Sequence, residues 1–144
     1  MKTIGRKDKI DLPGFDLQNI PAKVDTGAYG STLHCHHIEL TNRDGKEMLS
    51  FKILDPSHSK YEDRVFYAEE FSDKRVKNSG GKTEHRYTVK TEIIIFNNRR
   101  TIDFSLTDRN KMKYPILLGR TFLKNYFIVD VRLKDLSFKQ KNKN

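Results

Sequence analysis

Two short stretches in the first quarter of the chain carry side chains that could do chemistry. The first is Asp25-Thr26-Gly27, which directly follows the apolar-containing segment 20–24. A carboxylate at a strand end can face a cleft, a threonine hydroxyl is short and stiff, and a glycine lets another chain approach closely. The second stretch is the run 34–37, His-Cys-His-His, in which every side chain is a competent zinc ligand. The two stretches predict different chemistries, one with a carboxylate and one with a metal.

The spacing of the second stretch argues against a metal site. Neighbouring residues of a strand point to opposite faces, so only His34 with His36, or Cys35 with His37, could converge. A structural zinc takes four ligands, and a catalytic zinc takes three and a water. The other two histidines fall in predicted loops, and the sequence has no His-Glu-x-x-His helix and no glycine-rich phosphate loop. We therefore expect ordinary strand residues here, with no metal and no cofactor. A zinc-dependent protease that uses His34–His37 remains the alternative.

The elements that must position these residues are predicted to be mostly strands. Turn-forming pairs such as Asp44-Gly45 and Asn97-Asn98 separate short β-branched or aromatic segments, which favours hairpins and a mostly antiparallel sheet. The only predicted helix is short and covers 120–126, and the charged stretches 55–64 and 69–86 are predicted to be long loops. The predicted strands are 3–6, 9–12, 20–25, 32–40, 49–54, 64–69, 87–96, 101–106 and 127–131.

Composition narrows the class of protein. At 144 residues the chain is of single-domain size, and we expect one domain over 1–138 followed by a polar, basic, frayed tail over 139–144. The formal net charge of +9 suits an anionic partner. Nucleic acid is not the partner we expect, because the aromatic residues are scattered among apolar positions rather than interleaved with Arg and Lys. The single cysteine, Cys35, and the absence of long apolar runs favour the cytoplasm without a membrane partner.

A second motif late in the chain makes the Asp25 segment more specific. Ile116-Leu117-Leu118-Gly119-Arg120 is an apolar strand followed by a glycine and an arginine. The combination of the two motifs resembles the retropepsin-like aspartic peptidases. More closely, the chain is similar to a bacterial family described as ATP-dependent zinc proteases, which shares that fold and often occurs beside ATP-grasp peptide ligases. The resemblance runs through 22–28, 31–34, 75–81 with Arg86, 106–109 with Met112, and 116–120.

The resemblance implies a mainly β fold, a closed retropepsin-like barrel of the acid protease type with one short C-terminal helix. It implies that the late strand supports the Asp25 loop and that the glycine-rich segment near Gly80 closes over a substrate. The implied catalytic residues are Asp25, Thr26 and Gly27. The implied substrate-binding residues are Ala28, Tyr29, Gly30, Arg75, Ser79, Gly80, Gly81 and Arg86. The implied substrate is a peptide or a glutamylated protein, with a functional link to an ATP-grasp peptide ligase.

One aspartate is half of what an aspartic peptidase needs. One carboxylate takes a proton from the attacking water while the other, protonated, polarises the carbonyl oxygen. The chain has a single Asp-Thr-Gly, so a homodimer with a two-fold axis through the site must supply the second Asp25. We expect an aspartic endopeptidase that cuts a peptide or isopeptide bond. The alternative from another class is a catalytically weak binding module with the same fold.

The chain also departs from the viral members of the fold. Those members carry acidic residues after the motif, and these residues pair with the arginine of the late motif. Here the positions hold Tyr29 and Gly30. We therefore expect Arg120 to find another partner, either Asp11 or Asp130.

Overall fold

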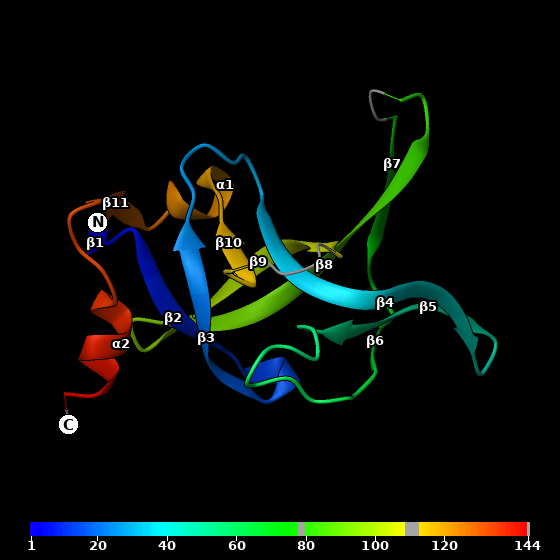
Figure 1. Cartoon of the computed structure of the whole chain (residues 1–144), viewed down its shortest axis with the longest axis horizontal. Coiled ribbons are helices and arrows are strands. Elements are labelled where there is room, and N and C mark those ends of the chain that lie inside the picture. Colours follow the sequence, from blue (N-terminus) through cyan, green and yellow to red (C-terminus); the bar gives the residue numbers. More distant parts are fainter. Residues whose placement is uncertain (78–79, 109–112, 144) are drawn as a thin grey trace.

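The computed structural model describes residues 1–77, 80–108 and 113–143, and most of them lie in strands (Figure 1). The strands are β1 (Lys2–Ile4), β2 (Lys7–Leu12), β3 (Leu17–Val24), β4 (Ser31–Arg43), β5 (Lys46–Ile53), β6 (Phe66–Ala68), β7 (Ser72–Lys77), β8 (Thr83–Ile95), β9 (Asn98–Thr107), β10 (Ile116–Leu118) and β11 (Phe127–Val129). The helices are a 3-10 turn η1 (Pro13–Phe15), α1 (Arg120–Leu123) and α2 (Leu136–Lys141).

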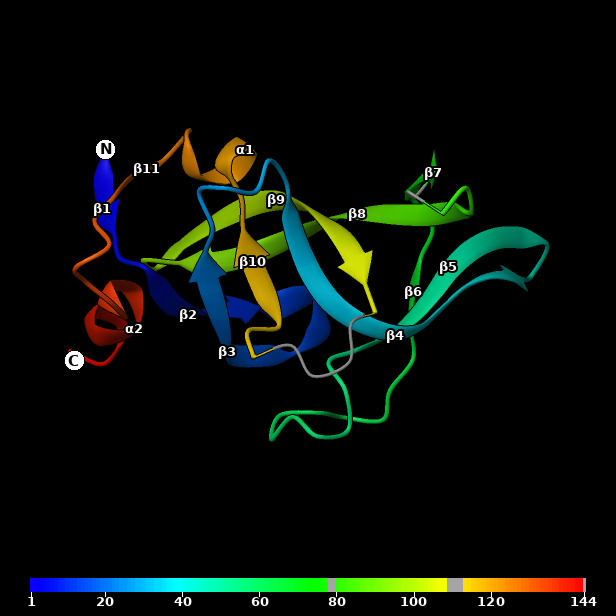
Figure 2. The same ribbon diagram turned by 45° about the horizontal axis from the view of Figure 1, so that its top comes forward.

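Six strands close into a barrel, which confirms the predicted fold class. The order β10-β3-β2-β8-β9-β4 returns to β10, because β10 is parallel to β3 and antiparallel to β4. Figure 2 shows β10 lying between β3 and β4. The ribbon of β4 and β5 extends away from the barrel, with β6 along its edge, and β1 pairs with β11 in a separate parallel sheet. The short strand β10 is therefore the piece that closes the barrel.

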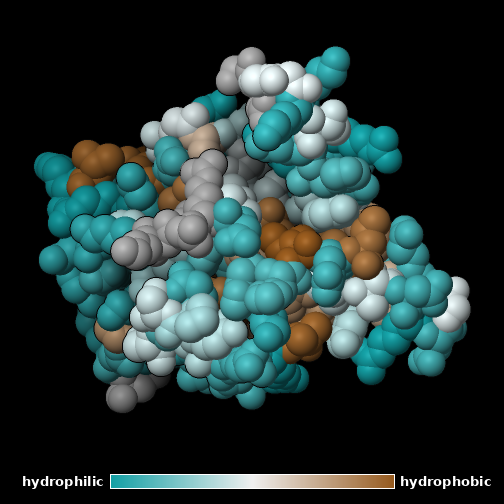
Figure 3. Space-filling view, turned by 45° about the vertical axis from the view of Figure 1, so that its right-hand side comes forward, coloured by the Kyte–Doolittle hydropathy of each residue, from teal (hydrophilic) through white to brown (hydrophobic). Residues whose placement is uncertain are grey.

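The core is formed by buried residues that alternate along β3 and β10 and occur at consecutive positions in parts of β2, β4 and β5. In β3 and β10, side chains such as Ala22, Val24, Ile116 and Leu118 are buried, whereas Lys23 between the first two is exposed. Apolar side chains of β2, β8 and β9 fill the rest of the barrel. Charged side chains cover much of the outside, and Figure 3 shows one largely hydrophilic face with only a few hydrophobic groups. The low apolar content of the chain is thus concentrated in one small core.

The two predicted hairpin turns, between β4 and β5 and between β8 and β9, are both present. Asp44 (φ 54°) and Gly45 (φ 81°) join β4 to β5, as predicted. The β8–β9 turn is centred one residue earlier than predicted, because the positive φ angles fall on Phe96 (50°) and Asn97 (59°) and Asn98 already belongs to β9. Phe96 is buried in this turn, so its burial outweighs the preference of a left-handed conformation for small or polar residues.

The prediction of a long loop over 69–86 was wrong. Residues 72–77 and 83–88 form the outer half of a hairpin, with Ser72 opposite Thr88 and Lys77 opposite Thr83. Figure 1 shows this β7–β8 hairpin standing away from the barrel. Because most described side chains on both of its faces are exposed, its sequence lacks the alternation of polar and apolar residues that indicates a strand.

The C-terminal segment holds a second helix that the sequence did not suggest. The predicted helix is present as α1, but residues 139–141, expected in a frayed tail, lie in α2. The buried carboxylate of Asp8 accepts hydrogen bonds from the backbone N–H groups of Ser137 (2.9 Å) and Phe138 (3.1 Å) at the start of α2. Lys141 Nζ lies 2.9 Å from a carboxylate oxygen of Asp11. Partners distant in sequence therefore hold α2.

Burial sets the charge balance of this anchor. Burial raises the pKa of the Asp8 carboxyl, and the three backbone N–H groups of Ser137, Lys9 and Phe138 oppose that rise. Ser137 in turn donates its backbone N–H to Asp8 and accepts the N–H of Phe96 on its hydroxyl (2.7 Å).

Among the described residues, no helix is long and apolar enough to cross a membrane.

We predict that Asp8→Ala destabilises the chain by about 2 kcal/mol, since it removes a helix cap and leaves buried N–H groups without acceptors. The free energy of unfolding in urea measures the loss. Asp103→Ala, at an exposed ion pair with Lys90, is the matched control and should cost under about 1 kcal/mol. Equal losses in the two variants would contradict the anchoring role of Asp8.

Candidate active site

The loop after β3 presents Asp25. The Asp25 backbone N–H donates to the carbonyl of Leu118 in β10 (2.9 Å), which extends the β3–β10 pairing by one residue. The half-buried Asp25 side chain accepts the N–H of Gly27 on Oδ1 (3.1 Å). Ala28 N–H donates to the Asp25 carbonyl (3.2 Å). The carboxylate is thus held in a tight turn, and Thr26 and Gly27 beside it are exposed.

The segment from Gly119 to Thr121 supports this loop through backbone hydrogen bonds. Gly119 N–H donates to the hydroxyl of Ser31 (2.9 Å), Arg120 N–H to the carbonyl of Ala28 (2.9 Å), and Thr121 N–H to that of Tyr29 (3.0 Å). A Cβ on Gly119 would overlap the backbone carbonyl of Gly30. The two motifs therefore touch through their backbones, and the glycine is required by close approach rather than by an unusual φ.

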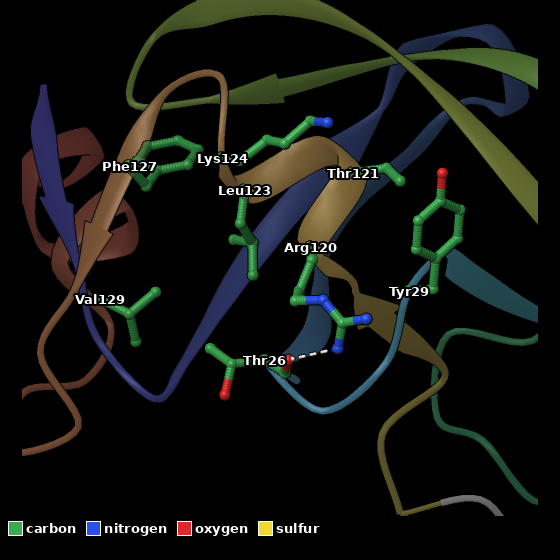
Figure 4. Close-up of a pocket in the computed structure, with 8 residues that line it drawn as sticks. All are labelled: Thr26, Tyr29, Arg120, Thr121, Leu123, Lys124, Phe127 and Val129. Atoms are coloured by element: carbon green, nitrogen blue, oxygen red, sulfur yellow. Dashed lines mark hydrogen bonds between the residues drawn. The ribbon is translucent and has the colours of Figure 1, made fainter.

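Arg120 takes a partner that the sequence did not indicate. Its guanidinium donates to the carbonyl of Thr26 (3.0 Å) and lies 6.0 Å from the ring centroid of Tyr29 (Figure 4). The prediction of Asp11 or Asp130 was wrong. Asp11 binds Lys141, and Arg132 holds Asp130 in two side-chain hydrogen bonds that lower the pKa of that carboxyl to about 2. The arginine thus ties the Thr26 backbone to α1.

An apolar pocket opens beside Thr26. It has a volume of about 370 Å³, and its apolar side chains come from α1 and β11 (Figure 4). Two cations, Arg120 and Lys124, also line it. The full set of lining residues is Thr26, Tyr29, Arg120, Thr121, Leu123, Lys124, Phe127 and Val129. Sequence reasoning gave no role to Leu123, Lys124 or Phe127, because they become neighbours of Thr26 only through the barrel closure.

The expected substrate-binding residues fall into two groups. Ala28, Tyr29 and Gly30 belong to the Asp25 loop, whereas Gly80 and Gly81 lie at the tip of the β7–β8 hairpin. The two arginines of that hairpin lie on opposite faces of it, because Arg86 is paired with Lys74 and Arg75 with His85, one position further along. The first group is therefore next to Asp25 in its loop, whereas the second lies on the β7–β8 hairpin, which stands away from the barrel (Figure 1). Ser79, Arg109 and Met112 lie outside the described residues.

The histidine run is engaged in the fold. His34 is buried, with Nδ1 3.1 Å from the carbonyl of Thr107 and Nε2 3.0 Å from the carboxylate of Asp55. Cys35 points into the core, where burial raises the pKa of its thiol well above the usual value. His36 contacts the Tyr61 hydroxyl (3.1 Å), and burial is the main cause that lowers its pKa. Over the described ranges, no three His, Cys, Asp or Glu side chains are grouped to hold a metal ion.

Ser31 joins the two motifs, a role that sequence reasoning did not assign to it. It is a buried polar side chain at the start of β4, and its hydroxyl accepts the N–H of Gly119. A serine directly after the glycine of a loop is common, so the sequence alone held no sign that this hydroxyl joins the two motifs.

We predict that Gly119→Ala destabilises the chain by about 3 kcal/mol, because the new methyl group meets backbone atoms that cannot rotate away. Gly14→Ala is the control, since a Cβ there meets no atom within 4 Å. Thermal unfolding of both variants checks the prediction. A melting temperature for Gly119→Ala equal to that of Gly14→Ala would show that the two motifs are not in backbone contact.

Comparisons with known proteins agree with this geometry. The family model described as "RimB-like: Retropepsin-like aspartic endopeptidase RimB" matches residues 3–140. A crystal structure of a protein of unknown function from Legionella pneumophila is similar, with a TM-score of 0.74 and 28% identity, over 94% of this chain and 98% of that one.

Curated relatives are longer proteins. One from Parasynechococcus marenigrum is 32% identical over 88% of this chain and 27% of its own length, and one from Desulfotalea psychrophila is 32% identical over 92% and 29%. Both are named probable alpha-L-glutamate ligase. The chain thus spans under a third of the length of these relatives. Because the family model covers nearly all of it, the chain belongs to the RimB-like family of retropepsin-like aspartic endopeptidases.

Proposed function

We propose that the chain is an aspartic endopeptidase that acts as a homodimer in the cytoplasm and hydrolyses a peptide or isopeptide bond. The observation that carries the proposal is the form of the Asp25 loop. Hydrogen bonds to Leu118 and from Arg120 hold the loop in place, yet its residues Thr26 and Gly27 are exposed in the single chain. A rigid loop that presents a carboxylate on an open surface fits one half of a two-fold site.

Exposed apolar residues around this loop favour a dimer interface that covers it. Tyr29, Val131 and Ile128 are 72%, 67% and 59% exposed. Tyr29 also lines the apolar pocket beside Thr26, and Ile128 lies in β11 between the pocket residues Phe127 and Val129. Large apolar side chains exposed on an otherwise charged surface are typical of an interface. A two-fold axis near Thr26 would bury them and bring the two Asp25 side chains together.

The chemistry follows from the pairing. Two carboxylates a few ångströms apart cannot both ionise cheaply, so the pair shares one proton and titrates as a unit. The ionised member accepts a proton from the water as it attacks, and the protonated member donates to the carbonyl oxygen. Thr26 and Gly27 would hold the two loops in register, and the glycine-containing hairpin tip at Gly80 and Gly81 would exclude water above the substrate.

The relatives' names favour an acidic substrate. The ligase name belongs to proteins more than three times as long as the matched segment, so we assign the ligase activity to their remaining length. A peptidase partnered with a glutamate ligase would act on peptides or proteins that carry added glutamates. The exposed cations of the hairpin, including Arg75 and Arg86, fit such a substrate.

We predict that Asp25→Asn lowers the rate of cleavage of a peptide ending in several glutamates by roughly 10³-fold or more, because the pair loses its ionisable group. The variant should keep the sedimentation coefficient of the parent protein. Metal chelators should leave the parent's activity unchanged. Activity that survives the substitution would favour a binding module, and activity lost with chelator and restored by zinc would favour the His34–His37 alternative.

We also predict that Ile128→Glu weakens the dimer by about tenfold or more and lowers cleavage in parallel, since a charge would be buried in the interface. Leu40→Glu, at a 43% exposed apolar residue of β4 far from the Asp25 loop, is the matched control. Sedimentation over a range of concentrations measures both variants. A dimer unaffected by Ile128→Glu would remove the proposed interface.

A further inference from the structure

The outer face of the barrel carries a row of residues that continues from the Asp25 strand. Strand register places Leu117 opposite Lys23 and also opposite Thr32. It then places Thr32 opposite Ser105, and Ser105 opposite Thr88. Register partners in a sheet share a face, so these side chains form one row, which we call the polar row: Lys23, Leu117, Thr32, Ser105 and Thr88.

The polar row faces away from the core on the same side as Asp25. The neighbours of Lys23 and Leu117 along their strands are fully or nearly fully buried, whereas Lys23 is exposed and Leu117 is half-buried. Asp25 follows Lys23 by two residues and extends the β3 pairing through its N–H, so the two side chains leave the sheet on the same side. Their Cα atoms are about 7 Å apart by strand geometry. The polar row therefore begins next to Asp25 on the same side of the sheet.

A like-charged pair stands at the Asp25 end of the row. Lys7 of β2 is directly opposite Lys23 of β3. Like charges at opposed positions destabilise a sheet. Neither lysine forms a salt bridge within the described part of the chain. The repulsion between Lys7 and Lys23 is therefore not offset by an ion pair among the described residues, and a bound anion would reduce it.

The other end of the row runs onto the hairpin. Thr88 is opposite Ser72, and the next pair on the same face is Lys74 with Arg86. The opposite face carries Asp73, which lies 2.9 Å from His85 Nδ1. Asp73 is thus paired on the far face, whereas the second acidic residue of the hairpin, Glu84, lies two positions from Arg86 on the same face as the Lys74–Arg86 pair. Lys74 and Arg86 have no ionic partner over the described ranges.

Thr32, in the middle of the row, has an orphaned hydroxyl. Its Oγ1 is inaccessible to water and has no hydrogen-bond partner among the described residues, although the residue itself is half-buried. An unpaired buried hydroxyl is costly. Rotation about χ1 to another staggered rotamer moves Oγ1 to a different position around Cβ, so the hydroxyl can turn to the exposed side when a partner arrives.

We propose that the polar row, with Lys7 at one end and the Lys74–Arg86 pair at the other, is a specificity wall that binds acidic side chains of the peptide substrate. The cations bind the carboxylates, and the Thr32 hydroxyl donates to a carboxylate or carbonyl oxygen. The inference rests on the proposed peptidase function, which it deepens by assigning the residues that select the substrate. A peptide is favoured over a nucleic acid because the row offers no aromatic side chain on which bases could stack.

Binding to the inactive full-length Asp25→Asn protein tests the wall without relying on cleavage. The probe is a fluorescein-labelled six-residue peptide of alternating Glu and Ala, compared with its Gln-for-Glu counterpart. We expect the Glu peptide to bind about tenfold more tightly or better. Lys23→Gln or Arg86→Gln should each weaken binding of the Glu peptide by about fivefold. Lys46→Gln removes the same charge from the β4–β5 turn, outside the polar row, and should change the affinity by under about twofold.

Thr32→Val separates recognition from folding. Removal of the orphaned hydroxyl should leave the melting temperature unchanged or higher, yet weaken binding of the Glu peptide by about threefold or more. Thr32→Ser keeps the hydroxyl and should retain the affinity. A drop in melting temperature with unchanged affinity would overturn the role of Thr32.

The outcomes keep the two proposals apart. Equal binding of the Glu and Gln peptides, equal effects of Arg86→Gln and Lys46→Gln, or full competition by an oligothymidylate of the same charge would each overturn the wall. Selective binding of the Glu peptide by Asp25→Asn, together with no cleavage by the parent dimer, would keep the wall and reject the peptidase. Cleavage by the parent protein without preference for Glu would do the reverse.

Discussion

The insertion of β10 between β3 and β4 is the constraint on which the rest of the structure depends. This strand closes the barrel, and its last residue accepts the N–H of Asp25. The following residues then meet the loop backbone to backbone, where Gly119 leaves no room for a side chain. Fixing one strand therefore fixes the shape of the loop, the place of Arg120 and the outline of the apolar pocket. The loop is held in one conformation because it is hydrogen-bonded to the closed barrel.

The distribution of charge is the second organising feature. Several aspartates are used inside the chain as caps or ion-pair partners, including Asp8, Asp11, Asp55, Asp73 and Asp130. With these anions engaged, the excess of basic residues is left on the surface, and part of it follows the outer face near Asp25. The net charge of +9 is thus carried by exposed basic side chains, some of which lie near Asp25. The opposite end of the Asp25 loop is apolar, so one site borders two surfaces of contrasting character.

Sequence patterns foretold the elements whose stability is local. The Asp44-Gly45 turn and the strand into Asp25 carry their own residue preferences. Elements that depend on distant partners were missed or misplaced. Helix α2 is held by Asp8 and Asp11 from the other end of the chain, and the exposed hairpin has no apolar face to reveal it. The partner of Arg120 could not be found either, because it is a backbone carbonyl, and backbone groups leave no trace in the residue types.

The distance along the chain between the two halves of the loop has a consequence for how the protein forms. Arg120 and Thr26, which it holds, are 94 residues apart in sequence. Contacts between segments so far apart in sequence slow folding, because loop-closure entropy is lost before the contacts form. During synthesis Asp25 therefore leaves the ribosome long before the strand that shapes its loop. A partly made chain that ends before β10 therefore carries Asp25 without the strand that shapes its loop.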